Sequence, residues 1–321
     1  MSQTPGLSKH TAFGIQIQAQ EGVEASDNVL WVPVNGTVSL RHRANREYPR
    51  QADHVDGRHL HFSAGQWAQG DVGFILVPDA TVLPDLLEWM LDRDSYNQGA
   101  LATVYKYSLT GAGAVYESFV DCKVQEATIT LEKGRPVMLN LSVVGRKPGV
   151  ATPAVSMTTV TGPFLWKESA VQVAYAGEVA ASDNTFERAE IRVNNNVEDP
   201  GEGLRLTSSD DGGKYPAKIY NLAGIEVSGS CSRDFLNDSL TSAWVNQVDD
   251  DFGDTYDGQL IYTLARGAVS LILTVNRVQW GDPGPDYPGD NNSRLTQDLD
   301  FEALTESTET DPTQPLEYSI P

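Results

Sequence analysis

The regular alternation of apolar and polar residues between Ser118 and Gly145 is the strongest structural signal in the chain. Its apolar positions are Val124, Ala127, Ile129, Leu131, Val137, Leu139, Leu141 and Val143, with Thr128, Thr130, Met138, Asn140 and Ser142 between them. A period of two is typical of a β-strand that buries one face. Lys133-Gly134 interrupts the pattern as a tight turn with positive φ would. The stretch therefore predicts a long β-hairpin.

Shorter stretches of the same kind predict strands on both sides of this hairpin. They are 13–17, 29–32, 71–77, 103–109, 115–120, 170–175, 189–193, 219–228, 259–264, 269–278 and 295–304. Apolar residues spaced as on one face of an α-helix occur twice, at 83–91, where Pro84 suits the first turn, and at 234–248. The pattern predicts a mainly β protein with one α-helix in each half.

The two halves have the same order of predicted elements: strands, helix, two strands, loop and strand. In this order 115–124 corresponds to 269–278, and 137–145 corresponds to 295–303. We interpret the correspondence as a diverged internal duplication. The segment 151–162, rich in Pro, Thr and Ala, is the predicted linker between a first domain at 1–150 and a second domain at 163–321.

A polar segment from Arg41 to about Gln69 separates the early strands of the first half. It contains five arginines and only three acidic residues, and no periodicity is sustained before His59. A polar insertion of this length in a compact domain is usually functional or disordered. We interpret it as an arm that orders against a partner. The candidate contact residues are Arg41, Arg43, Arg46, Arg50, His54, Arg58 and His59.

Composition excludes several classes of protein. The 321 residues are 40% hydrophobic, and no apolar run approaches the roughly 18–20 residues that cross a bilayer. The first residues lack the layout of a signal peptide, so we expect synthesis in the cytoplasm and no membrane contact. Cys122 and Cys231 lie far apart in sequence, and we interpret them as reduced, partly buried thiols.

The formal charge of −21 is distributed unevenly. Residues 1–160 carry 16 acidic and 13 basic side chains, whereas residues 161–321 carry 28 and 10. This balance excludes a protein that grips nucleic acid by neutralising phosphates, because that requires clustered Lys and Arg. It is compatible with a surface that must avoid binding nucleic acid.

Candidate catalytic and metal-binding motifs are incomplete. His42, His54, His59 and His61 lie in one region but lack a further ligand at tight spacing, so we interpret them as hydrogen-bonding contacts. The acidic run at 249–258 has no Glu in the twelfth position of a calcium loop. We therefore interpret it as a solvated loop. No serine lies in a nucleophile elbow, and Ser228–Ser232 reads as a strand-to-helix turn with a capping serine. We expect no enzyme activity, cofactor or metal.

Several stretches resemble the tail tube (major tail) proteins of long-tailed, siphovirus-type bacteriophages, in their two-domain form. The resemblance covers nearly the whole chain. It rests on Phe13-Gly14-Ile15 followed by Gln20-Glu21-Gly22-Val23, the helix at 83–91, the hairpin at 124–145, Phe164-Leu165, 171–175, 191–196, and Val227-Ser228-Gly229-Ser230.

The resemblance implies tandem antiparallel β-sandwich or half-barrel domains, each flanked by one helix. Rings of such chains would stack into a hollow tube in the virion tail, assembled in the host cytoplasm, with DNA passing through the lumen without specific binding. The implied partners are further copies of the chain and the tape measure, terminator and tail tip proteins. The hairpin residues would form the tube wall, and acidic side chains would line the lumen.

The number of chains in a ring follows from the number of domains. Tubes of this family are built on sixfold rings of one β domain per position, so two such domains per chain predict a trimer with pseudo-sixfold symmetry. The alternative is a hexamer of chains with one tube domain and one peripheral domain. As an alternative function, the chain would be a β-sandwich virion module that binds carbohydrate or a receptor; an acidic hydrolase is a more distant possibility.

Overall fold

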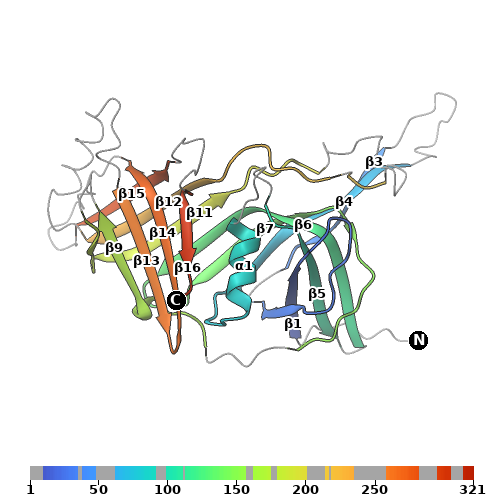
Figure 1. The fold of residues 1–321 in the computed structure, drawn as a ribbon, viewed down its shortest axis with the longest axis horizontal. Coiled ribbons are helices and arrows are strands. Elements are labelled where there is room, and N and C mark those ends of the chain that lie inside the picture. Colours follow the sequence, from blue (N-terminus) through green and yellow to red (C-terminus); the bar gives the residue numbers. More distant parts are fainter. Residues whose placement is uncertain are drawn as a thin grey trace, which may run out of the picture.

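Antiparallel strands make up most of the chain in the computed structural model. The structure describes residues 10–34, 38–47, 62–91, 99–110, 113–156, 162–174, 179–200, 214–216, 218–234, 258–281, 295–304 and 314–321. The strands form one 16-stranded sheet that folds around two lobes. Figure 1 shows the lobes side by side along the long axis, with the single described helix between them.

The first lobe is formed by the first half of the chain. Its elements are β1 (His10–Ile17), β2 (Leu30–Pro33), β3 (Arg41–Glu47), β4 (Phe62–Ile75), α1 (Val82–Leu91), β5 (Ala102–Thr110), β6 (Gly113–Glu132), β7 (Met138–Gly145) and β8 (Lys147–Pro148). They pair in the order β2-β1-β5-β6-β7-β4-β3, and every pair is antiparallel.

The second lobe follows after a 3₁₀ turn. Its elements are η1 (Trp166–Glu168), β9 (Ser169–Ala174), β10 (Ala181–Ser182), β11 (Phe186–Asn194), β12 (Glu226–Asp234), β13 (Gly258–Arg266), β14 (Val269–Trp280), β15 (Thr296–Ala303) and β16 (Leu316–Ser319). They pair in the order β10-β9-β13-β14-β15-β12-β11, with β16 beside β14. Pairing between β11 and β6 joins the lobes.

The hairpin predicted at 124–145 is present, and its apolar stripe is buried. Ile129 pairs with Leu139 and Ala127 with Leu141 across β6 and β7, and Gly134 in the turn has φ 80°. The named apolar residues are at most 2% exposed. Val124 lies next to a register shift. This explains why the next buried residue, Ala127, is three positions further along rather than two.

Two hairpins repeat with one register. Val104 lies opposite Phe119 in β5 and β6, and Leu260 lies opposite Val275 in β13 and β14, 156 residues later in each case. The register shifts between Ala102 and Val104 in the first pair and between Gly258 and Leu260 in the second, at equivalent positions. The equal offset of 156 residues supports the predicted duplication. It also makes residue 113, rather than residue 115, the counterpart of residue 269. The domain limits at 150 and 163 stay a prediction.

The long strand of each hairpin bends where a non-glycine residue has positive φ. These residues are Asp121 in β6 (φ 56°) and Arg277 in β14 (φ 49°), again 156 positions apart. Each strand pairs with its hairpin partner up to the residue after the bend, and beyond the bend it pairs with β7 or β15. A left-handed residue reverses which side of the strand faces the next neighbour, and this lets one strand serve two sheets.

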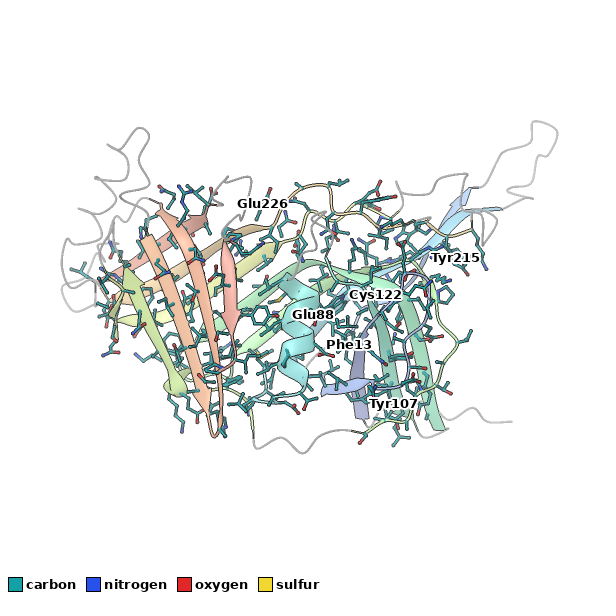
Figure 2. All side chains as sticks on the ribbon, in the orientation of Figure 1. Phe13, Glu88, Tyr107, Cys122, Tyr215 and Glu226 are labelled. Atoms are coloured by element: carbon teal, nitrogen blue, oxygen red, sulfur yellow. The ribbon has the colours of Figure 1, made fainter. Side chains whose placement is uncertain are left out.

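Helix α1 packs between the lobes. Its N-terminus is capped by Asp79, whose carboxylate accepts hydrogen bonds from the amides of Thr81 (2.8 Å) and Val82 (3.2 Å). The indole of Trp89 donates to the carbonyl of Cys122 at 2.9 Å. Phe13 and Cys122 lie inside the first lobe (Figure 2). One continuous hydrophobic core runs from the helix into both lobes.

Several sequence predictions need correction. Ser228–Ser232, predicted as a strand-to-helix turn, lies within β12, and the strand predicted at 219–228 begins only at Glu226. The second helix was predicted from Asp234, but this residue ends β12; residues 235–248 lie outside the described residues. Cys122 and Cys231 are free and wholly buried rather than partly exposed.

Candidate functional site: the polar face of the central sheet

The central sheet consists of β3, β4, β7, β6, β11, β12 and β15, hydrogen-bonded in this order across both lobes. One face covers the core. The other face carries polar side chains in rows that cross the strands, because paired residues of adjacent strands point to the same side. This second face is called the polar face below.

Two rows show the composition of the polar face. One runs Asn140, Thr128, Arg192, Ser228 and Glu302 from β7 to β15. The next runs Asp71, Ser142, Glu126, Asn194 and Glu226 from β4 to β12. Small hydroxyl, amide and carboxylate side chains dominate both rows. These two rows are therefore hydrophilic and mainly acidic. Farther along β3 and β4 the same face carries Arg41, Arg43 and Trp67.

Two arginines on this face share one carboxylate. Glu190 accepts hydrogen bonds from Arg192 Nε at 2.6 Å and from Arg188 Nη2 at 2.8 Å. Burial raises the pKa of Glu190, but these hydrogen bonds and the two positive charges outweigh burial and hold the pKa below its usual value. Glu190 therefore stays ionised at neutral pH and cancels part of the positive charge that a phosphate would meet.

The polar face is hollowed where the lobes meet. A cavity of about 540 Å³ lies over β6, β11, β12 and β15, and Glu126, Glu226 and Glu302 are among its lining residues. Figure 2 shows Glu226 at the rim between the lobes. Within the described part of the chain, no group of three or more His, Cys, Asp and Glu side chains is placed to hold a metal ion. The cavity is a depression in a broad acidic surface.

The comparison with protein families agrees with this architecture. The model of the family described as phage tail tube protein matches residues 62–303, which include most of the central sheet. The chain belongs to the phage tail tube protein family. No curated protein matches the chain. As a tail tube protein, it is a structural component of the phage tail, a class that self-assembles and contacts other tail proteins.

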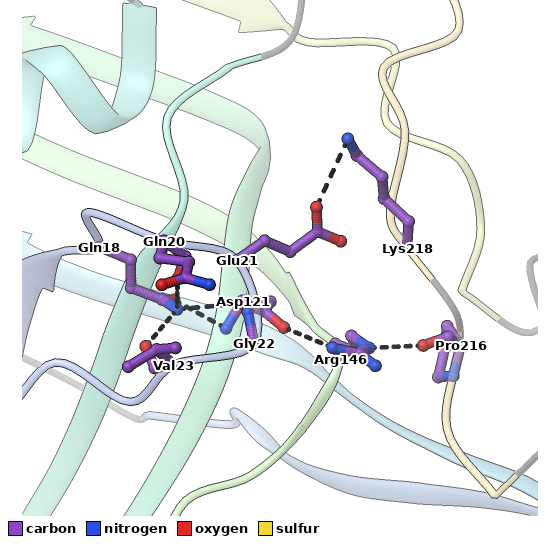
Figure 3. Close-up of polar contacts among 9 residues, drawn as sticks. All are labelled: Gln18, Gln20, Glu21, Gly22, Val23, Asp121, Arg146, Pro216 and Lys218. Carbon is purple, nitrogen blue, oxygen red and sulfur yellow. Dashed lines mark hydrogen bonds and ion pairs between the residues drawn. The ribbon is translucent and has the colours of Figure 1, made fainter. Parts of the chain in front are cut away.

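A cluster of buried polar groups lies at the bend of β6. Asp121, at the bend of β6, accepts hydrogen bonds through Oδ1 from Gln18 Nε2 (2.9 Å) and Gly22 N (2.7 Å). Through Oδ2 it pairs with Arg146 Nη1 at 3.1 Å, and Arg146 Nε donates to the carbonyl of Pro216 at 2.7 Å (Figure 3). This buried cluster fixes the bend and ties it to a segment of the second half.

A second buried polar contact joins the two halves. Asn195 is 1% exposed, and its Nδ2 donates to the carbonyls of Met90 (3.0 Å) and Val124 (2.9 Å). Met90 lies in the last turn of α1, where helix carbonyls have no partner within the helix. The side-chain amide of Asn195, which belongs to the second half, therefore supplies a hydrogen-bond donor to the end of α1 and also contacts the predicted wall hairpin.

The residues of the predicted arm fall into two groups. Arg41 and Arg43 lie on β3, and their side chains are exposed. Arg46 is on β3 next to a register shift. Arg50, His54, Arg58 and His59 lie outside the described residues. Both ends of this segment are strands although their sequence has no apolar alternation, because Arg41–Glu47 pairs with the first part of β4.

Sequence reasoning missed the residues that make the polar face distinctive. Strand 186–194 places Arg188, Glu190 and Arg192 at alternate positions, which predicts a charged row on one strand face. That signal could have identified the self-neutralised arginines. Nothing local could have identified Asp121 or Asn195, because their partners are distant in sequence. Among the described residues, no helix has the length and hydrophobicity needed to pass through a lipid bilayer.

Proposed function

We propose that this chain polymerises into stacked rings that form the hollow tail tube, through which genomic DNA passes during ejection. The single observation that carries the proposal is the continuous central sheet, whose polar face crosses both halves. Such a sheet has the form of a wall segment: one face is held by the core, and the other is smooth, hydrophilic and acidic. Along it, Arg188 and Arg192 are both paired with Glu190, which reduces the positive charge that DNA would meet there.

The polar face is the proposed lumen surface. A conduit for DNA must repel rather than hold phosphates, since a few Lys or Arg contacts suffice for strong nonspecific binding. Carboxylates on β4, β6, β12 and β15 and the pairing of the β11 arginines with Glu190 support this assignment, whereas Arg41 and Arg43 at the β3 end of the face lie at the boundary of the proposed lumen surface. The apolar residues behind the face, including Ile129 and Leu139, would give the wall its rigidity.

The remaining assignments extend the proposal to assembly. The two halves, 1–150 and 163–321, would be the two tube domains, and three chains would supply six positions in a ring. The arm would reach the neighbouring ring and pair its arginines with acidic surfaces of the second half. Tape measure, terminator and tail tip proteins would bind the interior and the ends of the tube.

The proposal is tested by imaging the purified chain over a range of concentrations with negative-stain electron microscopy. We expect filaments of uniform diameter with a central channel above a threshold concentration. Single particles at every concentration, with binding to host-surface carbohydrate instead, would favour a receptor-binding module and overturn the proposal.

A further inference from the structure

The segment that follows β8, residues 149–156, lies across the first lobe and is called the strap below. It covers the face of β1, β2 and β5 opposite the main core. There the indole of Trp31 donates to the carbonyl of Ala154 at 3.1 Å. Ala151 and Val155 pack against a small buried cluster that includes Trp31. The first half of the predicted linker is therefore fixed to the first lobe.

One carboxylate, that of Glu24 in the connection between β1 and β2, holds the start of the strap. It accepts hydrogen bonds from the amides of Val150 (2.7 Å) and Ala151 (3.0 Å). The hydroxyl of Tyr105 donates to Glu24 Oε1 at 3.3 Å. Burial and the nearby charge of Glu24 raise the pKa of Tyr105 well above its usual value, so this hydroxyl stays a donor. A Cβ at Gly149 would lie 2.2 Å from Glu24 Oε1, so the close approach requires glycine there.

The internal repeat contains the strand before the strap as well. Pro148 of β8 pairs with Phe119, and Leu316 of β16 pairs with Val275, which lies 156 positions after Phe119. β8 and β16 are therefore counterparts that occupy the same place in their lobes. β8 differs in leading, through the strap, from one lobe into the other.

The loop that carries Glu24 is longer than its counterpart in the second lobe. The repeated hairpins make Ile15 of β1 the counterpart of Val173 of β9. Fifteen positions separate Ile15 from its partner Leu30 in β2, whereas eight separate Val173 from its partner Ala181 in β10. The first lobe thus has a longer loop at the place where a chain segment has to be held on its way to the second lobe.

The far end of the linker is also fixed to the first lobe. The amide of Phe164 donates to the carbonyl of Leu76 at 3.0 Å, and its carbonyl accepts from the amide of Val137 at 2.9 Å. Arg266 of the second lobe donates to the carbonyl of Pro163 at 2.8 Å. Residues 157–161, which lie outside the described part of the chain, connect the two fixed ends. Five residues span at most about 18 Å.

The short connection decides which copy supplies the second lobe. The lobes meet through the pairing of β6 with β11, and the same pairing would be satisfied between two copies that exchange their second lobes. We propose that Glu24 is a latch that commits the second lobe to the first lobe of its own chain. Release of the strap from Val150 onward would free twelve residues, 150–161, with a reach of at most about 43 Å. A longer connection lowers the effective concentration of the partner lobe in the same chain.

The first test removes the latch and measures exchange of lobes. Glu24→Ala is refolded from urea and examined by size-exclusion chromatography with light scattering, below the threshold concentration for filaments. We expect about fourfold more dimer relative to monomer than in the parent chain, because effective concentration falls roughly as the −3/2 power of the free length. These dimers should persist on dilution. The matched control, Glu117→Ala, removes a carboxylate of the same lobe that pairs with Lys106, and should behave like the parent.

The second test keeps Glu24 and lengthens the connection instead. Seven Gly/Ser residues inserted after Thr159 give the same twelve-residue length with the latch intact, and we expect the same rise in dimer. The dimers are then made from isotope-labelled and unlabelled chains and treated with a zero-length cross-linker. Lys133 in the hairpin turn and Glu187 of β11 lie 2.6 Å apart, so exchanged lobes should give mixed-label cross-linked peptides.

A rise in fewer than both variants would overturn the latch, and so would cross-links confined to one copy. An equal rise in Glu117→Ala would overturn it too, since loss of any carboxylate would then suffice. Because dimers are measured below the threshold for filaments, a failure of the tube function leaves this test intact.

Discussion

At the scale of single residues, the fold depends on a few polar groups that would be costly in a core without partners. Asp121 has positive φ, a conformation that a small polar residue such as Asp tolerates better than most. Its carboxylate is held by two donors from the segment after β1 and by Arg146. The polar contacts compensate for both the desolvation of the charge and the unusual backbone, and the bend of β6 follows.

Replacing Arg146 with Ala tests this explanation. The Arg146 and Asp121 side chains are 8% and 3% exposed, so the variant leaves a buried carboxylate without its cation. We expect the free energy of unfolding to fall by about 3–5 kcal/mol, measured by urea denaturation. The matched control is Arg135→Ala, whose pair with Glu132 is exposed and should cost less than about 1 kcal/mol. Equal losses in the two variants would contradict the assigned role.

A second residue-scale prediction concerns the neutralised arginines of the polar face. In Glu190→Gln, Arg188 and Arg192 lose their shared carboxylate. We expect assembled tubes of this variant to bind a labelled DNA duplex about tenfold more tightly at low salt. The logarithm of the affinity should fall more steeply with the logarithm of salt concentration, by about one for each phosphate newly contacted.

The control for this measurement is Glu317→Gln, which removes the same charge from exposed β16, a strand outside the central sheet. It should leave DNA binding unchanged. If both variants bind DNA alike, net charge rather than the polar face governs the interaction, and the lumen assignment is wrong.

At the scale of elements, the hairpin β6–β7 gains its stability from one face. Leu139 is fully buried opposite Ile129, whereas Asn140, the next residue, is exposed on the polar face. We expect Leu139→Ala to lower the free energy of unfolding by about 2–5 kcal/mol, because it leaves a cavity in the core. Asn140→Ala should change it by less than about 0.5 kcal/mol. A comparable effect of the two substitutions, seen by denaturant titration, would mean that the hairpin does not divide core from surface as described.

The arm between β3 and β4 is the element with the most direct proposed part in stacking. In the second lobe, the connection between β11 and β12 contacts the first lobe: Lys214 accepts a hydrogen bond from the amide of Gln66, and Asn221 accepts one from Lys123. The arm occupies the equivalent place between β3 and β4, so the β11–β12 connection is an example within this chain of such a segment contacting a neighbouring lobe.

Deletion of Asn45–Asp56 should therefore leave a folded protein that no longer forms long filaments. Circular dichroism reports the fold, and negative-stain imaging reports the filaments. A replacement of the same segment by a Gly/Ser linker of equal length separates loss of arm contacts from strain at the shortened connection. Normal filaments from both variants would contradict the proposed role.

At the scale of the whole molecule, the repeated registers favour a ring of three chains. The first lobe contributes β3, β4, β7 and β6 to the central sheet, and the second contributes β11, β12 and β15, the counterparts of the first three, so one chain would fill two neighbouring positions. We expect native mass spectrometry of isolated rings to give three chains, and axial image averages to show six lobes of two alternating kinds. Six chains per ring, with six identical peripheral lobes, would establish the hexamer instead.

The sequence by itself determined the local structure. The period of two in 124–143 specified the hairpin and its buried face, and helical spacing after Asp79 specified α1, since these features depend on neighbours within a few residues. The order of elements was enough to reveal the repeat. The excess of acidic residues predicts a surface that avoids phosphates, and this stays a prediction.

Only the tertiary structure decided how these elements are joined. Strand β3 has no apolar alternation and exists because β4 offers it a partner, since strand formation depends on pairing as much as on propensity. The bend at Asp121 requires donors from 25 to more than 100 positions away. β6 pairs with β7 on one side and with β11 of the other half on its second side, and this second pairing, which no local pattern encodes, extends the polar face across both lobes.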